Sequence, residues 1–223
     1  MLRGISNRVT ALLFVFTSLC FASDVAPESA PWVEVGKENG ITISRRKLQN
    51  DPVFAYRGEG TLEASIGKII SVALDVPRRV EWVNRLEVAR VVRDISPNHK
   101  IIYMKVRAPW PVNDRDFLVD SVFQFDPKKQ AASFDMKSVE DPTVPPDRCC
   151  VRAHVSSNHI ELKATSDKRT EVVAEAHVDP KGSLPAWLVN LVQKTFPRKT
   201  LEGLLKQVNK PDISDYLEAH PKR

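Results

Sequence analysis

The stretch APWPVNDRDFLVD, residues 108–120, changes character halfway along its length. Two prolines flank a tryptophan and stiffen the chain, and Asn113 and Asp114 are typical turn residues. After the turn, polar and apolar residues alternate, which predicts a strand over Asp116–Phe125 with one apolar face. Arg115 falls on that apolar face, where an arginine is costly unless it is paired. Either Arg115 meets the polar group of a ligand, or it forms a structural ion pair at the end of the strand.

Length and composition bound the class of protein. The chain has 223 residues, enough for one sizeable core, with 16 prolines and 8 glycines and no low-complexity segment. Its formal net charge is +5, but basic and acidic residues are interspersed, which argues against a nucleic-acid-binding face. We therefore expect a monomer with one globular domain over residues 23–209 and no nucleic-acid partner. A polar tail over residues 210–223 is expected to fray.

The first 22 residues are typical of a secretory signal peptide. Met1–Arg8 is short and basic, and Val9–Phe21 is mostly apolar but shorter than the roughly 20 residues that span a membrane. Small residues at Cys20 and Ala22 favour cleavage after Ala22. We expect an exported protein, periplasmic in a Gram-negative organism and secreted otherwise.

Cleavage would leave two adjacent cysteines, Cys149 and Cys150. A redox pair is one interpretation of them. Because neighbouring side chains of a strand point to opposite faces, we favour the other, two small apolar residues buried in a strand. The five histidines show no metal-ligand spacing, and Ser183 is better explained as a helix cap than as a nucleophile. We expect no metal, no cofactor and no catalytic centre.

Hydrophobic periodicity predicts the order of the elements. Two β-type runs come first, over Ile41–Lys47 and Val53–Leu62, and Gly58 and Gly60 suggest a bulge or bend in the second. A helix capped by Ser65 or Thr61 and a short helix from Pro77 follow. The remaining strands are expected at Leu86–Ile95, Lys100–Val106, Asp116–Phe125, Ala132–Val139, Cys149–Val155, His159–Ala164 and Thr170–Val178.

The longest predicted element is a helix over Leu184–Val208, capped by Ser183. Its apolar residues recur with a period of about 3.6, and Pro197 should kink it. Sequential strands with short connections predict an antiparallel sheet, and this helix must cover the apolar face of that sheet. The fold class is therefore α+β, with a curved sheet wrapped around one long C-terminal helix.

Four blocks of the sequence carry a resemblance to a known family. They are WVEVGKENGITISRR, DVPRRVEWVNRLEVARVV, KIIYMKVRAPWPVNDRDFLVD and HVDPKGSLPAWLVNLVQKTFPRKTLEGLL. Together they resemble the START (StAR-related lipid-transfer) domain from about Trp32 to Val208. The resemblance implies the helix-grip fold, in which an incomplete antiparallel barrel grips a C-terminal helix over an internal apolar cavity. It also implies binding, and transfer, of a lipid or another hydrophobic small molecule.

The resemblance and the alternation along each strand together predict which residues line the cavity. They are Ile102, Met104, Arg115, Phe117, Val119, Ser121, Phe123, Phe134, Met136, Val151, Ala153, Val172, Ala174, Trp187, Leu188 and Leu191. Taken singly, each could be ordinary core, so the cavity itself rests on the resemblance. Because the family carries the arginine–aspartate pair across members with unlike ligands, the resemblance favours the structural role for Arg115. The inward face of the preceding strand offers no acidic partner, which argues against a sterol-specific ion pair.

A cavity that encloses a lipid must open. We expect the C-terminal helix, or an adjacent loop such as Asp126–Lys129, to be the gate and to touch a membrane surface transiently. Lys194, Arg198 and Lys199 are candidates for contact with anionic headgroups, although we favour the simpler explanation that they form a solvated helix face. Two other functions stay open on the same scaffold: a small-molecule enzyme of cyclase or hydrolase type, and a ligand-responsive interaction module.

Overall fold

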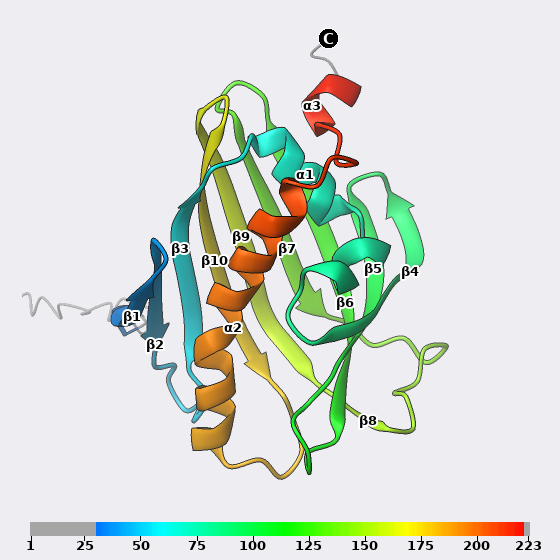
Figure 1. Cartoon of the computed structure of the whole chain (residues 1–223). Coiled ribbons are helices and arrows are strands. Elements are labelled where there is room, and N and C mark those ends of the chain that lie inside the picture. The colour runs from blue at the N-terminus through cyan, green and yellow to red at the C-terminus, as the bar shows by residue number, and fades with distance from the viewer. Residues whose placement is uncertain (1–29, 221–223) are drawn as a thin grey trace, which may run out of the picture.

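The computed structural model describes residues 30–220. The expected signal peptide, residues 1–22, lies outside these described residues. The described chain forms strands and helices in the following order: β1 (Val33–Glu38), β2 (Ile41–Arg46), β3 (Ala55–Leu62), α1 (Ile66–Leu74), the 3-10 helix η1 (Pro77–Glu81), β4 (Leu86–Ser96), β5 (His99–Val106), β6 (Asp114–Asp126), β7 (Ala131–Ser138), β8 (Cys150–Arg152), β9 (His154–Ser166), β10 (Arg169–Asp179), α2 (Ala186–Val208) and α3 (Tyr216–Ala219) (Figure 1).

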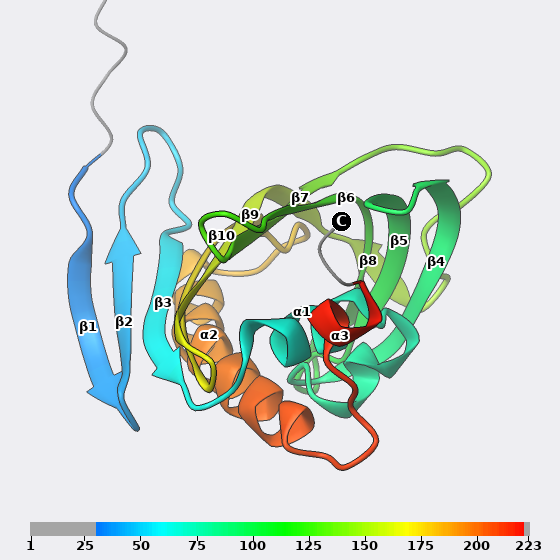
Figure 2. The ribbon, with the colours of Figure 1, turned by 90° about the horizontal axis from the view of Figure 1, so that it is seen from above.

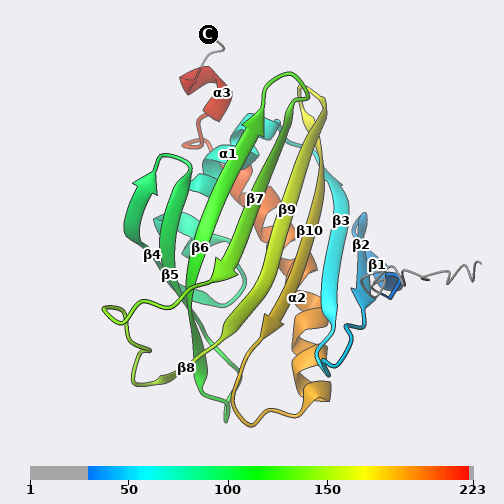
Figure 3. The ribbon, with the colours of Figure 1, turned by 180° about the vertical axis from the view of Figure 1, so that it is seen from behind.

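The strands form one sheet in the order β1-β2-β3-β10-β9-β7-β6-β5-β4. Every neighbouring pair in that order is antiparallel, as predicted. Viewed from above, the sheet curves around α1 and α2, so the helices lie on its concave face (Figure 2). Figure 3 shows the opposite, convex face, along which the long strands β6, β7, β9 and β10 run side by side. The predicted helix-grip fold is confirmed.

The predicted strand over Cys149–Val155 is divided in two. β8 pairs in parallel with the start of β6, and Ala153 then leads into β9, which pairs with β7. Cys149 precedes β8 and is exposed, and Cys150 is only half-buried. The preference for two buried cysteines in a strand is therefore wrong, because a turn over residues 147–150 replaces the expected alternation.

The long helix α2 begins at Ala186, and its N-cap residue is Pro185 rather than Ser183. A residue before proline is disfavoured in the helical region, so Leu184 cannot continue a helix that starts at Ser183. The amides of Leu188 and Val189 donate to the Pro185 carbonyl instead. The Ser65 cap of α1 is confirmed, because its hydroxyl accepts from the Lys68 amide at 3.2 Å.

Glycines mark where α2 crosses other elements closely. β3 pairs regularly with β2 and β10 through Gly58 and Gly60, so neither glycine forms a bulge. A Cβ atom built on Gly58 would lie 2.9 Å from the Cβ atom of Pro197, and one on Gly203 would lie 2.1 Å from the Trp82 carbonyl oxygen. These two glycines let α2 approach β3 and the residue after η1.

Part of the C-terminal segment that was expected to fray packs against the core through Ile213, Tyr216 and Leu217, whereas residues 218–220 are exposed. Asp215 caps α3 and accepts a hydrogen bond of 2.5 Å from Ser65 at the start of α1. Tyr216 lies edge-on to Phe123, with ring centroids 5.9 Å apart. A helix of four residues is too short to leave a periodic pattern, so its aromatic contacts with the sheet could not be foreseen.

Candidate functional site

The strand residues predicted to face inward do share the concave face. Residues directly opposite each other in antiparallel strands lie on the same face of a sheet. Ile102 is opposite Val119, and Met104 is opposite Phe117. Ser121 is opposite Met136, and Phe123 is opposite Phe134. In the neighbouring strands β10 and β9, Val172 and Ala174 are opposite Leu162 and Ile160.

One half of the concave face is filled by helices. Phe123, Phe134 and Val172 belong to a buried cluster with residues of α1 and of the second half of α2, among them Leu201 and Leu204. The rings of Phe123 and Phe134 have their centroids 4.8 Å apart. This half is packed as an ordinary core, which was the alternative for each residue taken singly.

The other half of the concave face is less completely covered, and we call it the open half. It is centred on Ile102 and Val119, which are 1% and 0% exposed. Around them lie apolar residues that are only half-buried although they face inward: Met104, Val106, Phe117, Met136 and Val178. Aliphatic, thioether and aromatic groups of this kind offer dispersion contacts and no charge, so the open half suits an apolar ligand.

One inward polar group was missed by the sequence reasoning. Asn158 is opposite both Met136 and Ala176, so it lies on the concave face and is half-buried there. The signal was available, since the alternation that places Ile160 and Leu162 inward also places Asn158 inward. With Ser121, which is 7% exposed, it provides hydrogen-bonding capacity on an otherwise apolar surface.

Arg115 has a structural role that the structure makes explicit. The residue is 7% exposed, and its guanidinium donates to three backbone carbonyls, those of Asn113, Pro180 (3.0 Å) and Lys181 (2.9 Å). Burial lowers the pKa of Arg115, and the neighbouring Asp114 counteracts that effect. The arginine thus fixes the connection between β10 and α2 to the start of β6. The expected acidic partner is replaced by carbonyl oxygens.

Val151 and Ala153 lie beside this anchor. Val151 is half-buried and pairs with Arg115 across β8 and β6, and Ala153 is 2% exposed. Asp116 points to the convex side, as the alternation predicts, but it is fully buried there. It accepts from Arg152 Nε at 3.0 Å and from the Asp147 amide at 2.9 Å, because the β7–β8 loop covers this patch of the sheet.

The three cavity residues predicted on the long helix lie elsewhere. Trp187 and Leu191 are 69% and 60% exposed, and Leu188 is half-buried. The first half of α2 instead buries Val189 and is held by polar contacts. Asn190 accepts from the Phe54 amide at 3.1 Å, and Gln193 donates to the Val178 carbonyl at 2.7 Å. The sequence reasoning placed these three residues on one wide apolar stripe facing the cavity, whereas the structure turns Trp187 and Leu191 to solvent.

A recess of about 410 Å³ lies at the end of the molecule where α1, the β4–β5 turn and the C-terminal segment meet. Asp75, Arg78 and Asp212 make its rim polar, and Arg78 pairs with Asp212 at 2.8 Å. A second space of about 10 Å³ shares Leu74 with this recess and reaches inward to Phe123. That is about the volume of one water probe, so packed side chains close this end.

Comparisons with known proteins now bear on this geometry. The family model described as START domain matches residues 19–211. The chain belongs to the START family. A similar sequence is the phosphatidylcholine transfer protein of Bos taurus, 21% identical over 81% of this chain and 85% of the relative. An uncharacterized protein of Pseudomonas aeruginosa is 25% identical over 80% of this chain and 87% of its own.

Solved structures agree with the family on the fold. Human STARD10 superposes with a TM-score of 0.74 at 21% identity, covering 85% of this chain and 76% of the other. A STAR-related lipid transfer protein fragment from Xanthomonas axonopodis gives 0.71 at 23% identity, covering 80% and 99%. At the level of the START family, lipid binding and transfer are supported. Among residues 30–220, no helix is both long and apolar enough to cross a membrane.

Proposed function

We propose that this START-family chain, as a monomer, binds one lipid or similarly apolar small molecule on the open half of its concave face and transfers it between membranes. The observation that carries the proposal is the apolar inward surface around Ile102 and Val119, whose rim residues are left half-exposed. Exposing a lipid chain to water costs about 0.8 kcal/mol per CH₂, so unaided escape from a bilayer is slow. An enclosing apolar surface removes that penalty.

Native mass spectrometry of the purified protein, followed by organic extraction, tests this proposal. We expect one lipid per protein monomer. A bound compound that is chemically converted would favour an enzyme of cyclase or hydrolase type instead. A ligand that changes binding to another protein, without being transferred between vesicles, would favour an interaction module.

We further propose that the first half of α2 is the gate. The second half is packed through Leu201, Leu204 and Val208, whereas the first half buries Val189 and relies on the hydrogen bonds of Asn190 and Gln193. Pro197 separates the two halves and lacks a backbone donor, which weakens the helix there. A segment with few buried apolar contacts is one that opens locally.

Two engineered disulfides test whether the lipid enters at this gate or at the closed end of the molecule under α3. The first joins Phe54→Cys to Asn190→Cys and ties down the first half of α2. The second joins Gly67→Cys to Asp215→Cys, where a Cβ atom on Gly67 would lie 2.4 Å from Asp215 Cγ, and locks the C-terminal segment. Both are made in a chain whose three native cysteines are replaced by serine.

In vesicle-to-vesicle transfer of a fluorescent phospholipid, the first disulfide should stop exchange until a reductant is added, and a preloaded lipid should stay bound. The second disulfide should leave the transfer rate unchanged. The opposite pattern would place the entrance under α3 and refute the proposed gate.

The membrane contact belongs to the same end of the molecule. The β5–β6 connection and the start of α2 both lie at this end (Figures 1 and 3). In that connection Trp110 is 93% exposed, and on α2 Trp187 and Leu191 are exposed as well. Tryptophan is favoured at the membrane interface because its ring is apolar and its N–H stays hydrated. Arg198 is engaged by Glu38 at 3.4 Å and Glu202 at 3.0 Å, which leaves Lys194 and Lys199 as the exposed cations.

Cosedimentation with vesicles of phosphatidylcholine and phosphatidylglycerol tests the contact. Trp187→Ser combined with Leu191→Ser should weaken binding and slow transfer. Val33→Ser is the matched control, since Val33 is a 55% exposed apolar residue on β1. Equal losses for the double variant and the control would contradict a specific contact.

Export is also a proposal, and it rests on residues 1–22 of the sequence. Replacing Leu12, Leu13 and Phe14 by charged residues should retain the precursor in the cytoplasm. N-terminal sequencing of the native protein should find Ser23 first. A native protein that starts at Met1 and stays in the cytoplasm would show that the export proposal is wrong.

A further inference from the structure

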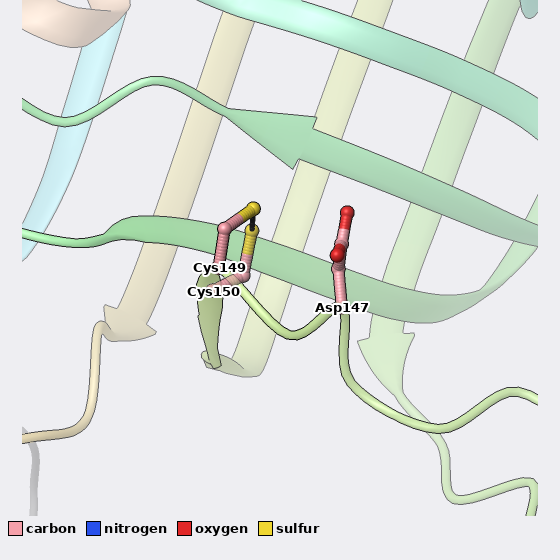
Figure 4. Close-up of side chains that lie close together, drawn as sticks. All are labelled: Asp147, Cys149 and Cys150. Atoms are coloured by element: carbon pink, nitrogen blue, oxygen red, sulfur yellow. Dashed lines mark hydrogen bonds between the residues drawn. The ribbon is translucent and has the colours of Figure 1, made fainter.

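The turn before β8 brings two thiols together. The Sγ atoms of Cys149 and Cys150 lie 3.3 Å apart, and Figure 4 shows both on the side of the chain to which Asp147 also points. The Cys150 amide donates to the Asp147 carbonyl at 2.9 Å, so Cys149 belongs to a turn and the alternation of a strand does not separate the two side chains. Cys149 is exposed and accessible to a reagent in solution.

A fixed positive charge stands beside one of these thiols. Lys105 Nζ, on β5, lies 3.2 Å from Cys149 Sγ. Carboxylates hold the lysine in place: Glu87 at 3.8 Å, Asp147 at 3.9 Å and Asp114 at 4.0 Å. The hydrogen bond to Cys149 raises the pKa of Lys105, so the amine stays charged. A neighbouring ammonium group stabilises a thiolate, the form of cysteine that reacts.

The second thiol differs from the first. Burial, together with the neighbouring Cys149, raises the pKa of Cys150 to about 12. Cys150 is therefore kept as the protonated partner, next to a sulfur that is exposed and faces a cation. An accessible nucleophile followed by a shielded resolving thiol is the arrangement used in thiol–disulfide exchange.

We propose that Cys149 and Cys150 form a dithiol site that is reversibly oxidised by low-molecular-weight disulfides. In the first step the Cys149 thiolate attacks one sulfur of a disulfide RSSR; a bond forms between Cys149 and SR, and RS⁻ leaves. In the second step Cys150 loses its proton to the departing thiolate and attacks Cys149 Sγ, which expels the second RS⁻. The protein loses two electrons to RSSR. One RS⁻ takes the proton of Cys150 and the other takes the proton that Cys149 released on ionising, so RSSR becomes two RSH and a Cys149–Cys150 disulfide remains.

The product should be easily reduced again. Consecutive Cα atoms are about 3.8 Å apart, shorter than the roughly 4.4–6.8 Å of ordinary disulfides, so the ring is strained and reducible. The two sulfur atoms and a carboxylate oxygen of Asp147 lie within 4.8 Å of one another, so the three residues are also a candidate site for a soft cation. Lys105 argues against that alternative, because its charge would repel a metal bound to Cys149.

Intact-mass spectrometry after treatment with oxidised glutathione tests the proposal. Cys20 is replaced by serine throughout, so that this pair alone is measured. The protein should lose two hydrogens and carry no lasting adduct, and dithiothreitol should restore both thiols. Cys150→Ser should trap one glutathionyl group on Cys149, whereas Cys149→Ser should react far more slowly. Circular dichroism checks that each variant is folded.

Lys105 provides the matched comparison. Lys105→Gln should slow adduct formation in the Cys150→Ser protein by about two- to fivefold, as expected for the loss of one partly exposed charge contact, and Lys105→Arg should retain the rate. A stable mixed disulfide on the unaltered pair would overturn the proposal. Protection of both thiols by equimolar Zn²⁺ would overturn it as well and assign the cluster to a metal.

Discussion

Replacing Arg115 by methionine tests whether this residue serves the fold or the ligand. Methionine keeps an unbranched apolar stem, although it is shorter than arginine, and removes every donor to the three carbonyls. A buried acceptor left without a donor costs about 1–3 kcal/mol. Asn113 and Lys181 are exposed residues whose carbonyls can turn to water, so Pro180 bears most of the loss. We therefore expect the free energy of unfolding to fall by about 1–3 kcal/mol.

Urea unfolding followed by tryptophan fluorescence measures this change, as a lower midpoint with an unchanged slope. Arg107→Met is the matched control. Arg107 directly follows β5, its side chain is 69% exposed, and it pairs with Glu87 on the surface. That control should change the free energy of unfolding by less than about 1 kcal/mol. Freed from its anchor, the connection before α2 should also let the gate open more often and speed lipid transfer. A variant with wild-type stability that no longer binds lipid would refute the structural role.

Three further expectations concern the wall, the helix crossing and acid stability. Phe134→Ala, at a site that is 3% exposed, should lower the free energy of unfolding by about 3–5 kcal/mol, whereas half-buried Phe117→Ala should cost less and shift the chain length of the bound lipid seen by mass spectrometry. Gly203→Ala should lower the thermal midpoint although alanine favours helices by about 1 kcal/mol, because its Cβ atom would meet a backbone oxygen; Gly36→Ala, with open space around it, is the control. Burial alone would raise the pKa of Asp116, but hydrogen bonds from Arg152 and the Asp147 amide lower it below the ordinary 3.8. The contribution of Asp116 to the free energy of unfolding is therefore complete above pH 3.8 and is lost as the pH falls through the lowered pKa. In Asp116→Asn, the free energy of unfolding should depend less on pH in the acid range.

Much of the fold could be predicted because its signals are local. Alternation along β6 and β7 placed Phe117, Val119 and Phe134 on one face, and the structure puts them there. The resemblance to the START domain then predicted that the sheet is curved, which hydrophobic periodicity alone cannot predict. The pattern of short strands did not predict that β8 runs parallel to β6. The direction of a strand depends on the path of the loop that precedes it, and hydrophobic periodicity does not show that path.

The errors at the candidate site have a common physical cause. Trp187 and Leu191 belong to one wide apolar stripe of the predicted helix, and periodicity does not show which part of that stripe faces the sheet. Contacts decide it: the hydrogen bonds of Asn190 and Gln193 rotate the first half of α2 so that Val189 is buried. The cysteine pair was misjudged for a similar reason, since a turn in place of a strand brings both thiols to one side.

The pairing of β3 with β10 bears on how the chain reaches this fold. Leu62 lies opposite Thr170, so the two strands meet only after nearly all the sheet between them has been synthesised. Contacts between residues so distant in sequence slow folding, because a long loop must close before they form. Until then β3 has an unpaired edge that invites association with another chain. We expect refolding to be slow and concentration-sensitive, with β3–β10 docking as the late event in which the two arms of the sheet become one.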